Sequence, residues 1–279
     1  MKRIAAITDE FAPDLETALP AMRDCGMTGA ELRTIHGRNI VDLSDAELDT
    51  VRETCRANGF EIVSIASPLL KCVLPGAPEL DRRFQHDVFA SAHTFADQPG
   101  IAQRAMAVAR TLGARIVRVF SYWRTIEPPK CFDAVVAALN ALAAEAARHN
   151  LILGLENEHA CNVGTASEAA AVLDAVRHPS LGLIWDPANA HVAGEPAFPE
   201  GYAKLPKDRI VHVHAKDWRS DWCALGEGDI DWNGQIAALK ADGYTGWISL
   251  ETHWVGPNGD KLEASRICGR TLRSLLDSQ

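Results

Sequence analysis

Short apolar runs alternate along the chain with longer segments in which apolar residues recur every three or four positions. The short runs predict β-strands and the longer segments predict amphipathic helices. The predicted strands are Arg3–Thr8, Gly29–Arg33, Glu61–Ala66, Arg115–Phe120, Leu151–Glu156, Leu181–Asp186, Arg209–His214 and Trp247–Glu251. The predicted helices are Asp14–Cys25, Asp45–Asn58, Gln103–Leu112, Asp133–His149, Ala166–Arg177, Asn233–Ala241 and Lys261–Leu276. Such regular alternation predicts βα units and a parallel sheet.

Glycine follows four of these helices, at Gly26, Gly59, Gly113 and Gly243, where a left-handed residue often caps the last turn. Eight βα units without a change of composition favour a closed (β/α)₈ TIM barrel that forms one domain over residues 1–279. A doubly wound sheet is the alternative. That fold normally has a Gly-rich phosphate loop after its first strand, and the segment here reads TDEFAPD.

The longest stretch without a predicted element runs from Ser67 to Pro99. It contains three more prolines, Pro68, Pro75 and Pro78. A loop of this length after a strand is often a functional lid. The alternative is an insertion that covers the barrel mouth without taking part in chemistry.

Composition narrows the classes of partner. The chain is 47% hydrophobic and 23% charged, as in ordinary globular proteins. Its net charge of −9 argues against nucleic acid as a partner, because nucleic-acid binding relies on a basic surface. No apolar run is long enough to span a bilayer, which argues against a membrane partner. A small polar molecule, such as a sugar or polyol, is the expected substrate, and a homo-oligomer is compatible with the sequence.

The N-terminal sequence and the cysteines indicate the cellular compartment in which the protein is found. The segment MKRIAAITDEF has too short an apolar run for a secretory signal. The seven cysteines include no CxxC pair, and such a scattered odd set indicates reduced thiols. Both features predict a cytoplasmic protein.

Four consecutive predicted strands end in a potential metal ligand: Glu156, Asp186, His214 and Glu251. In a barrel the carboxyl ends of the strands meet on one face, which carries the active site. A carboxylate after an apolar run such as WISL must find a partner, since an ionised group in apolar surroundings is costly. The pattern therefore predicts a site for one divalent metal ion.

Three carboxylates and one imidazole form a mostly hard, oxygen-rich ligand set. Such a set favours Mn²⁺ first, with Mg²⁺ and Co²⁺ close behind, over the closed Cys and His shell of a structural zinc site. Zn²⁺ in an open site is also compatible. A dication explains how three carboxylates share one pocket, because their mutual repulsion would otherwise raise at least one pKa.

Strand parity leaves two choices open. His212 and His214 are two residues apart and face the same side of the sheet. We favour His214 as the ligand because it lies nearer the carboxyl end, which makes His212 a core histidine. The same parity places Glu158 beside Glu156 and His253 beside Glu251, where they contact the substrate or extend into water.

Ordered motifs in the second half of the chain identify a family resemblance. They read GLENEH, IWDPAN, HVHAKD, GEGDIDW and GYTGWISLETH, with looser matches at GAELR and EIVSI. The chain resembles the sugar phosphate isomerase/epimerase family of xylose isomerase-like barrels, which includes D-tagatose 3-epimerase-like enzymes, hydroxypyruvate isomerase and inosose dehydratase.

This resemblance implies roles for individual residues. Glu156 and Glu251 would be metal ligands and the acid/base pair, with Asp186 and His214 completing the metal shell. Arg219 is the nearest match to a substrate-binding Arg, although its spacing is one residue short. Asn189 stands where the epimerases have a substrate-binding His, and Glu158 is a further expected substrate contact.

The resemblance and the ligand set together predict an isomerase or epimerase. Its substrate would be a ketose or related polyol-carbonyl compound, with or without phosphate, and the reaction a proton transfer through a metal-stabilised enediolate. An inosose dehydratase-like lyase is the first alternative, and a sugar sensor without catalysis is another. A phosphate group could lie near Lys216, Arg219 and the turn at 256–259.

An endonuclease IV-like DNA repair enzyme is a remote alternative. That family needs additional histidines at the ends of the third and fourth strands. Here these strands end in IASP and VFSYW, which offer none.

Overall fold

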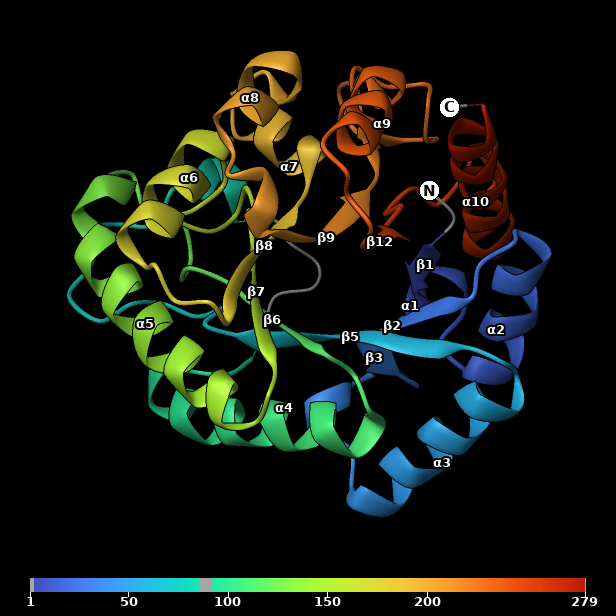
Figure 1. The fold of residues 1–279 in the computed structure, drawn as a ribbon, viewed down its shortest axis with the longest axis horizontal. Helices are drawn as coiled ribbons and strands as arrows, with labels where there is room; N and C mark the ends of the chain where they lie inside the picture. The colour runs from blue at the N-terminus through green and yellow to red at the C-terminus, as the bar shows by residue number, and fades with distance from the viewer. Residues whose placement is uncertain (1–2, 86–91, 279) are drawn as a thin grey trace.

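Eight parallel strands close into a barrel in a computed structural model that describes residues 3–85 and 92–278 (Figure 1). Their order around the barrel is β1-β12-β9-β8-β7-β6-β5-β2. The strands are β1 (Ile4–Ile7), β2 (Gly29–Leu32), β5 (Glu61–Leu69), β6 (Ile116–Val119), β7 (Ile152–Glu156), β8 (Leu181–Trp185), β9 (Ile210–Ala215) and β12 (Trp247–Leu250). The predicted barrel and its eight strands are confirmed.

Helices surround this barrel on the outside, as Figure 1 shows. The longer ones are α2 (Leu15–Asp24), α3 (Asp45–Ala57), α4 (Gln98–Leu112), α5 (Phe132–Arg148), α6 (Ala166–Ala175), α9 (Trp232–Ala241) and α10 (Lys261–Asp277). They match the seven predicted helices. The shorter elements are α1 (Thr8–Phe11), α7 (Pro187–Val192), α8 (Tyr202–Lys204), and the hairpins β3 (Thr34–Ile35) with β4 (Arg38–Asn39) and β10 (Asp217–Trp218) with β11 (Trp222–Cys223).

Local sequence signals fix the ends of the helices. The φ angles of Gly26, Gly59, Gly113 and Gly243 lie between 74° and 77°, the left-handed conformation expected of helix caps. At the start of α3, the Ser44 side chain accepts a hydrogen bond from the Glu47 N–H while the Glu47 carboxylate accepts one from the Ser44 N–H. This reciprocal capping box satisfies two otherwise unpaired backbone donors.

The segment between β5 and α4 is shorter than the sequence indicated. Strand β5 continues to Leu69, and α4 begins at Gln98, five residues before the predicted start. Pro99 fits the first turn of α4, because the N–H that proline lacks would have no partner there. The predicted lid includes residues 86–91, which lie outside the described residues.

Glycine allows close packing between β8 and β9. A Cβ atom added at Gly182 would lie 2.4 Å from Val211 Cγ1 and 3.1 Å from the Arg209 carbonyl oxygen. Neither neighbour can turn away easily, since valine is branched at Cβ and the other contact is backbone.

Gly182→Ala is therefore expected to lower the free energy of unfolding by about 1–3 kcal/mol, through overpacking. Gly100→Ala is the matched control: a Cβ at this position in α4 meets nothing within 4 Å. There the same change should raise the free energy of unfolding by about 0.5–1 kcal/mol, by removing the entropy cost of glycine in a helix. Urea unfolding measures both values, and equal effects of the two variants would contradict this account.

Within residues 3–85 and 92–278, none of the helices has the length and apolarity needed to cross a bilayer.

Candidate metal and substrate site

The four predicted ligands meet at the carboxyl ends of neighbouring strands. Glu156 ends β7, Asp186 follows β8, His214 lies near the end of β9 and Glu251 follows β12. All four side chains are buried, and one potential ligand atom from each lies within 4.8 Å of those of the others. The barrel thus brings together residues separated by as many as 95 positions in the sequence.

Hydrogen bonds hold Asp186 in place. The Asn157 amide donates from Nδ2 to the Asp186 carbonyl at 2.8 Å, and its Oδ1 accepts from the Asp186 N–H at 2.8 Å. Asp186 Oδ1 caps α7 by accepting from the Asn189 N–H at 2.9 Å. Within the described residues Asp186 Oδ2 accepts no hydrogen bond of good geometry, although Lys216 Nζ lies 3.0 Å away. This oxygen is therefore turned into the site.

His214 lies between Glu31 on one side and the pair Glu156 and Glu251 on the other. Its Nδ1 is 3.0 Å from Glu156 Oε1 and 3.4 Å from Glu251 Oε2. Its Nε2 is 3.1 Å from Glu31 Oε2, and the same oxygen lies 2.9 Å from His212 Nε2. Burial disfavours protonated His214, but Glu31, Glu156 and Glu251 outweigh it and raise its pKa well above the usual value. Without metal, both ring nitrogens therefore carry protons. A metal ion at Nδ1 would replace the proton there, while Glu31 would still accept a hydrogen bond from Nε2.

Glu31→Gln tests this arrangement. Loss of the negative charge behind His214 should weaken divalent-metal binding by about 10–100-fold, the usual cost of removing such a partner. Calorimetric titration of the metal-free protein with Mn²⁺ measures the dissociation constant directly. Glu61→Gln, the same change at an exposed position at the start of β5, should leave it unchanged. An unaltered metal affinity in Glu31→Gln would contradict a positioning role.

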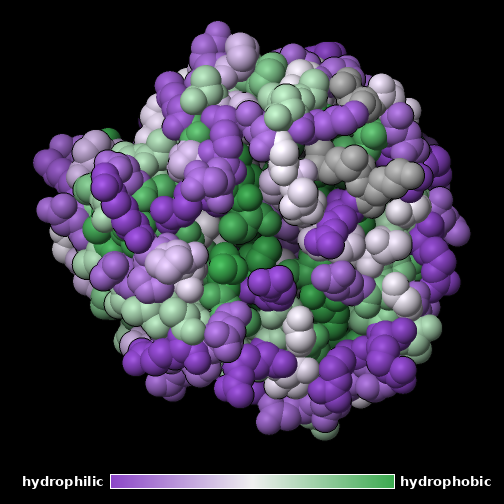
Figure 2. Space-filling view, viewed as in Figure 1, coloured by the Kyte–Doolittle hydropathy of each residue, from purple (hydrophilic) through white to green (hydrophobic). Residues whose placement is uncertain are grey.

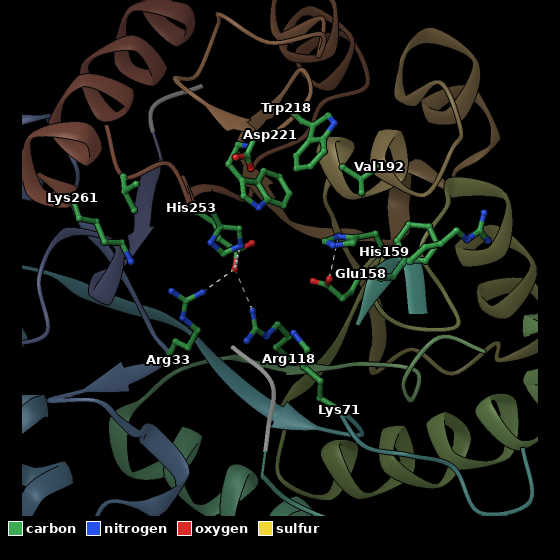
Figure 3. A pocket seen from close by; sticks show the side chains of 15 residues that line it. Arg33, Lys71, Arg118, Glu158, His159, Val192, Trp218, Asp221, His253 and Lys261 are labelled. Carbon is green, nitrogen blue, oxygen red and sulfur yellow. Dashed lines mark hydrogen bonds and ion pairs between the residues drawn. The ribbon is translucent and has the colours of Figure 1, made fainter. Parts of the chain in front are cut away.

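Three buried cations surround the carboxylates, and the sequence interpretation named only one of them, Lys216, as a possible phosphate contact. Lys216 Nζ is 2.8 Å from Glu251 Oε2, and an Arg118 nitrogen is 3.1 Å from Glu156 Oε2. Arg33 lies 3.2 Å from Glu251 Oε1 and also pairs with Asp9 and Glu10. Arg118 and His253 each lie 3.8 Å from Glu251 Oε1, and Figure 3 shows both of them, with Arg33, pointing toward the same part of the pocket. The sequence does mark Arg118 as unusual, because it is a charged residue within the apolar strand IVRV. A buried charge of this kind needs a partner in the interior.

Burial and these cations act in opposite directions on the carboxylates. Burial raises the pKa of Asp186, and Lys216 offsets part of this effect. Burial also disfavours ionised Glu156, but His214 and Arg118 outweigh it and lower the pKa. For Glu251 burial is likewise outweighed, first by Lys216, and the pKa lies well below its usual value. Glu156 and Glu251 are therefore ionised at neutral pH and able to accept a proton.

The donor set fits a divalent cation. Three buried carboxylates and one imidazole nitrogen supply hard ligands from different strands. Among the described residues, no well-placed donor reaches the buried Asp186 Oδ2. Glu31, His212 and His214 form a second group of potential ligands. Glu31 Oε2 lies within hydrogen-bond distance of both imidazoles, whereas Glu31 Oε1 and His212 Nδ1 have no hydrogen-bond partner among the described residues.

A cavity of about 760 Å³ lies above these residues. Figure 2 shows the opposite end of the barrel, at the amino ends of the strands, where hydrophilic side chains cover most of the rim and hydrophobic ones are visible toward the middle. The pocket is lined by Arg33, Lys71, Arg83, Phe84, Arg118, Glu158, His159, Val192, Trp218, Asp221, Trp222, Glu251, His253, Val255 and Lys261 (Figure 3). Its volume is that of a site for a small molecule.

The expected substrate contacts fall in different places. Glu158 and His253 line the pocket. Asn189 is buried beside it, with Nδ2 3.4 Å from Glu158 Oε2 and 3.5 Å from Glu156 Oε1. Arg219 does not line the pocket: its side chain is 64% exposed and lies 3.4 Å from Asp229.

The β10–β11 hairpin explains the position of Arg219. Asp217 accepts hydrogen bonds from the backbone N–H groups of Trp218, Gly226 and Ile230, which fixes the hairpin. Trp218 and Trp222, with ring centroids 4.9 Å apart, face the pocket in its place.

The fold and the site define a TIM barrel with a candidate metal centre and a small-molecule pocket at its carboxyl face. Residues 19–272 match the model of the xylose isomerase-like TIM barrel family, and the chain belongs to that family.

Three known proteins illustrate the similarity. The 3-oxo-isoapionate decarboxylase of Pectobacterium atrosepticum is 30% identical over 59% of this chain and 61% of its own length. The inosose dehydratase of Lactiplantibacillus plantarum is 22% identical over 63% of each chain. The chain thus spans about three fifths of the length of these curated relatives. The solved structure of IOLI protein with a bound zinc atom superposes with a TM-score of 0.77 at 18% identity, covering 99% of this chain and 98% of that one.

Proposed function

We propose that the protein is a divalent-metal-dependent isomerase or epimerase of a polyhydroxy carbonyl compound, with Mn²⁺ as the preferred ion. The observation that carries this proposal is the pair of buried, ionised carboxylates, Glu156 and Glu251, which both contact Nδ1 of His214. Glu156, Asp186, His214 and Glu251 would hold the ion. The bound ion would supply Lewis acidity, which makes a hydrogen on the carbon next to a carbonyl easier to remove.

The residues of the chain would carry the proton. One of the two ionised glutamates removes it from carbon. The other takes up a proton from water and returns it to the same carbon or to its neighbour, and the first glutamate then releases its proton to water. Return to the same carbon from the other side gives epimerisation, and return to the neighbour gives isomerisation. Lys216, Arg33 and Arg118 stabilise the negative charge that develops on oxygen. Glu158 and Asn189 would orient substrate hydroxyl groups.

A lyase is the second candidate. Lys216 lies within 3.0 Å of both Asp186 and Glu251, at the centre of the site, where an ammonium group could protonate a leaving hydroxyl. The relatives named as a dehydratase and a decarboxylase favour the same possibility. Both lyase reactions share with isomerisation the need to stabilise negative charge next to a carbonyl.

A single panel separates these reactions. The Mn²⁺-loaded protein is incubated in deuterium oxide with ketoses, ketose phosphates, inososes and 3-oxo acids, and the products are read by mass. Uptake of deuterium without a change of composition supports the isomerase or epimerase. Loss of water identifies a dehydratase, and loss of carbon dioxide identifies a decarboxylase. Absence of any change across all four substrate classes would overturn the proposed proton transfer.

A further inference from the structure

Two buried cations line the part of the pocket wall formed by β5 and β6. Lys71 follows β5 and Arg118 lies within β6. They are 6% and 5% exposed, and both line the pocket. Lys71 Nζ lies 4.6 Å from the centroid of the Phe120 ring, and the Arg118 guanidinium carbon lies 4.7 Å from it. Both cations thus pack against the same aromatic ring.

The guanidinium of Arg118 has donor capacity that the protein does not use. One terminal nitrogen donates to Glu156 at 3.1 Å and the other to the Ala66 carbonyl at 3.3 Å. Its Nε has no hydrogen-bond partner among the described residues. A buried donor without an acceptor costs free energy, which an anionic ligand would recover.

The charges on the floor of the site favour a negative group as well. A divalent ion together with Lys216 and Arg118 more than neutralises the carboxylates of Glu156, Asp186 and Glu251. Lys71 adds a further positive charge on the wall. Glu158 brings negative charge to the same pocket, and its Oε1 lies 3.2 Å from Nδ1 of His159.

We infer that the substrate of this pocket is an anion whose carboxylate or phosphate group binds to Lys71 and Arg118. The inference rests on the proposed function, since it takes the metal site as the place where the carbonyl group binds. The aromatic side of the pocket completes the fit. Trp222 lies 5.1 Å from the His253 ring and offers an apolar face to the carbon skeleton.

Three probes with the same hydroxyacetyl group test this inference by binding to the Mg²⁺-loaded protein. Dihydroxyacetone is neutral, hydroxypyruvate carries a carboxylate and dihydroxyacetone phosphate carries a phosphate. Calorimetry or ligand-observed NMR gives the three dissociation constants. At least one anionic probe should bind about tenfold or more tightly than dihydroxyacetone, the contribution of a charge-assisted hydrogen bond. The comparison of the two anions identifies the group that the pocket prefers.

Lys71→Met decides where the anion binds. A carboxylate could also gain affinity by binding the metal ion directly. If Lys71 binds the anion, the ratio of affinities between the anionic probe and dihydroxyacetone must fall to about twofold or less in Lys71→Met. The affinity for dihydroxyacetone and the metal content should stay unchanged. Lys71→Gln provides the same test if the Met variant does not fold. Lys261→Met, which removes a charge from another part of the pocket wall, should keep the preference.

Equal affinities for all three probes, or a preference that survives in Lys71→Met and Lys71→Gln, would overturn the inference. The two proposals fail separately, because binding needs no turnover. Anion preference without deuterium uptake by any substrate would count against the proposed reaction alone. Deuterium uptake by neutral ketoses without anion preference would count against the anionic substrate alone.

Discussion

Glu156→Gln and Glu251→Gln should each lower the rate of deuterium exchange at the substrate carbon by about 10²–10⁴-fold, the usual contribution of a positioned acid or base. Glutamine keeps the size of the side chain but cannot accept a proton from carbon. The lowered pKa of each glutamate keeps the wild-type groups ionised at neutral pH, as a base must be before it can accept a proton. The rate is followed by mass spectrometry with the substrate that the panel identifies.

Metal content decides how this result is interpreted, because both residues are also proposed ligands. The comparison is therefore made at a Mn²⁺ concentration that saturates each variant, as verified by titration. Glu61→Gln is the matched control. Glu61 lies at the amino end of β5, at the end of the barrel away from the site, and this variant should exchange at the wild-type rate. Exchange at that rate in both metal-loaded site variants would remove Glu156 and Glu251 from the proton transfer.

The barrel could be predicted from the sequence because its units are local. Each strand is a short apolar run, and glycines such as Gly113 and Gly243 end helices at the expected positions. The start of α4 was predicted five residues late, since Pro99 within its first turn resembles a loop residue in sequence. Strand ends also predicted which residues would meet, because a parallel barrel places them all on one face.

The neighbours of the predicted ligands depend on contacts that sequence spacing does not reveal. Glu31 and His214 are 183 positions apart, and they meet only because the barrel closes. Arg118 could be recognised as unusual in its strand, but not as a partner of Glu156 across 38 positions. Arg219 was placed at the substrate by motif spacing, whereas the hairpin held by Asp217 turns it toward solvent.

Asp186→Asn should reverse the order of stability between the metal-free and metal-loaded proteins. Without metal, the variant should be at least as stable as the wild type, because burial raises the pKa of Asp186 and ionising it in the fold is unfavourable at neutral pH. Asparagine can still cap α7. With Mg²⁺ at a hundred times the dissociation constant, the wild type should gain about 2.7 kcal/mol and the variant little.

Urea unfolding with EDTA and with Mg²⁺ measures all four free energies. Asp260→Asn makes the same change at an exposed N-cap, that of α10, and should leave the stabilisation by Mg²⁺ intact. A variant that loses stability in EDTA would show that the pairing of Asp186 with Lys216 outweighs burial of its charge. Equal stabilisation of Asp186→Asn and wild type by Mg²⁺ would exclude Asp186 as a ligand. The buried carboxylate is thus expected to cost stability without metal and to provide it when metal binds, as befits a residue placed for function rather than for folding.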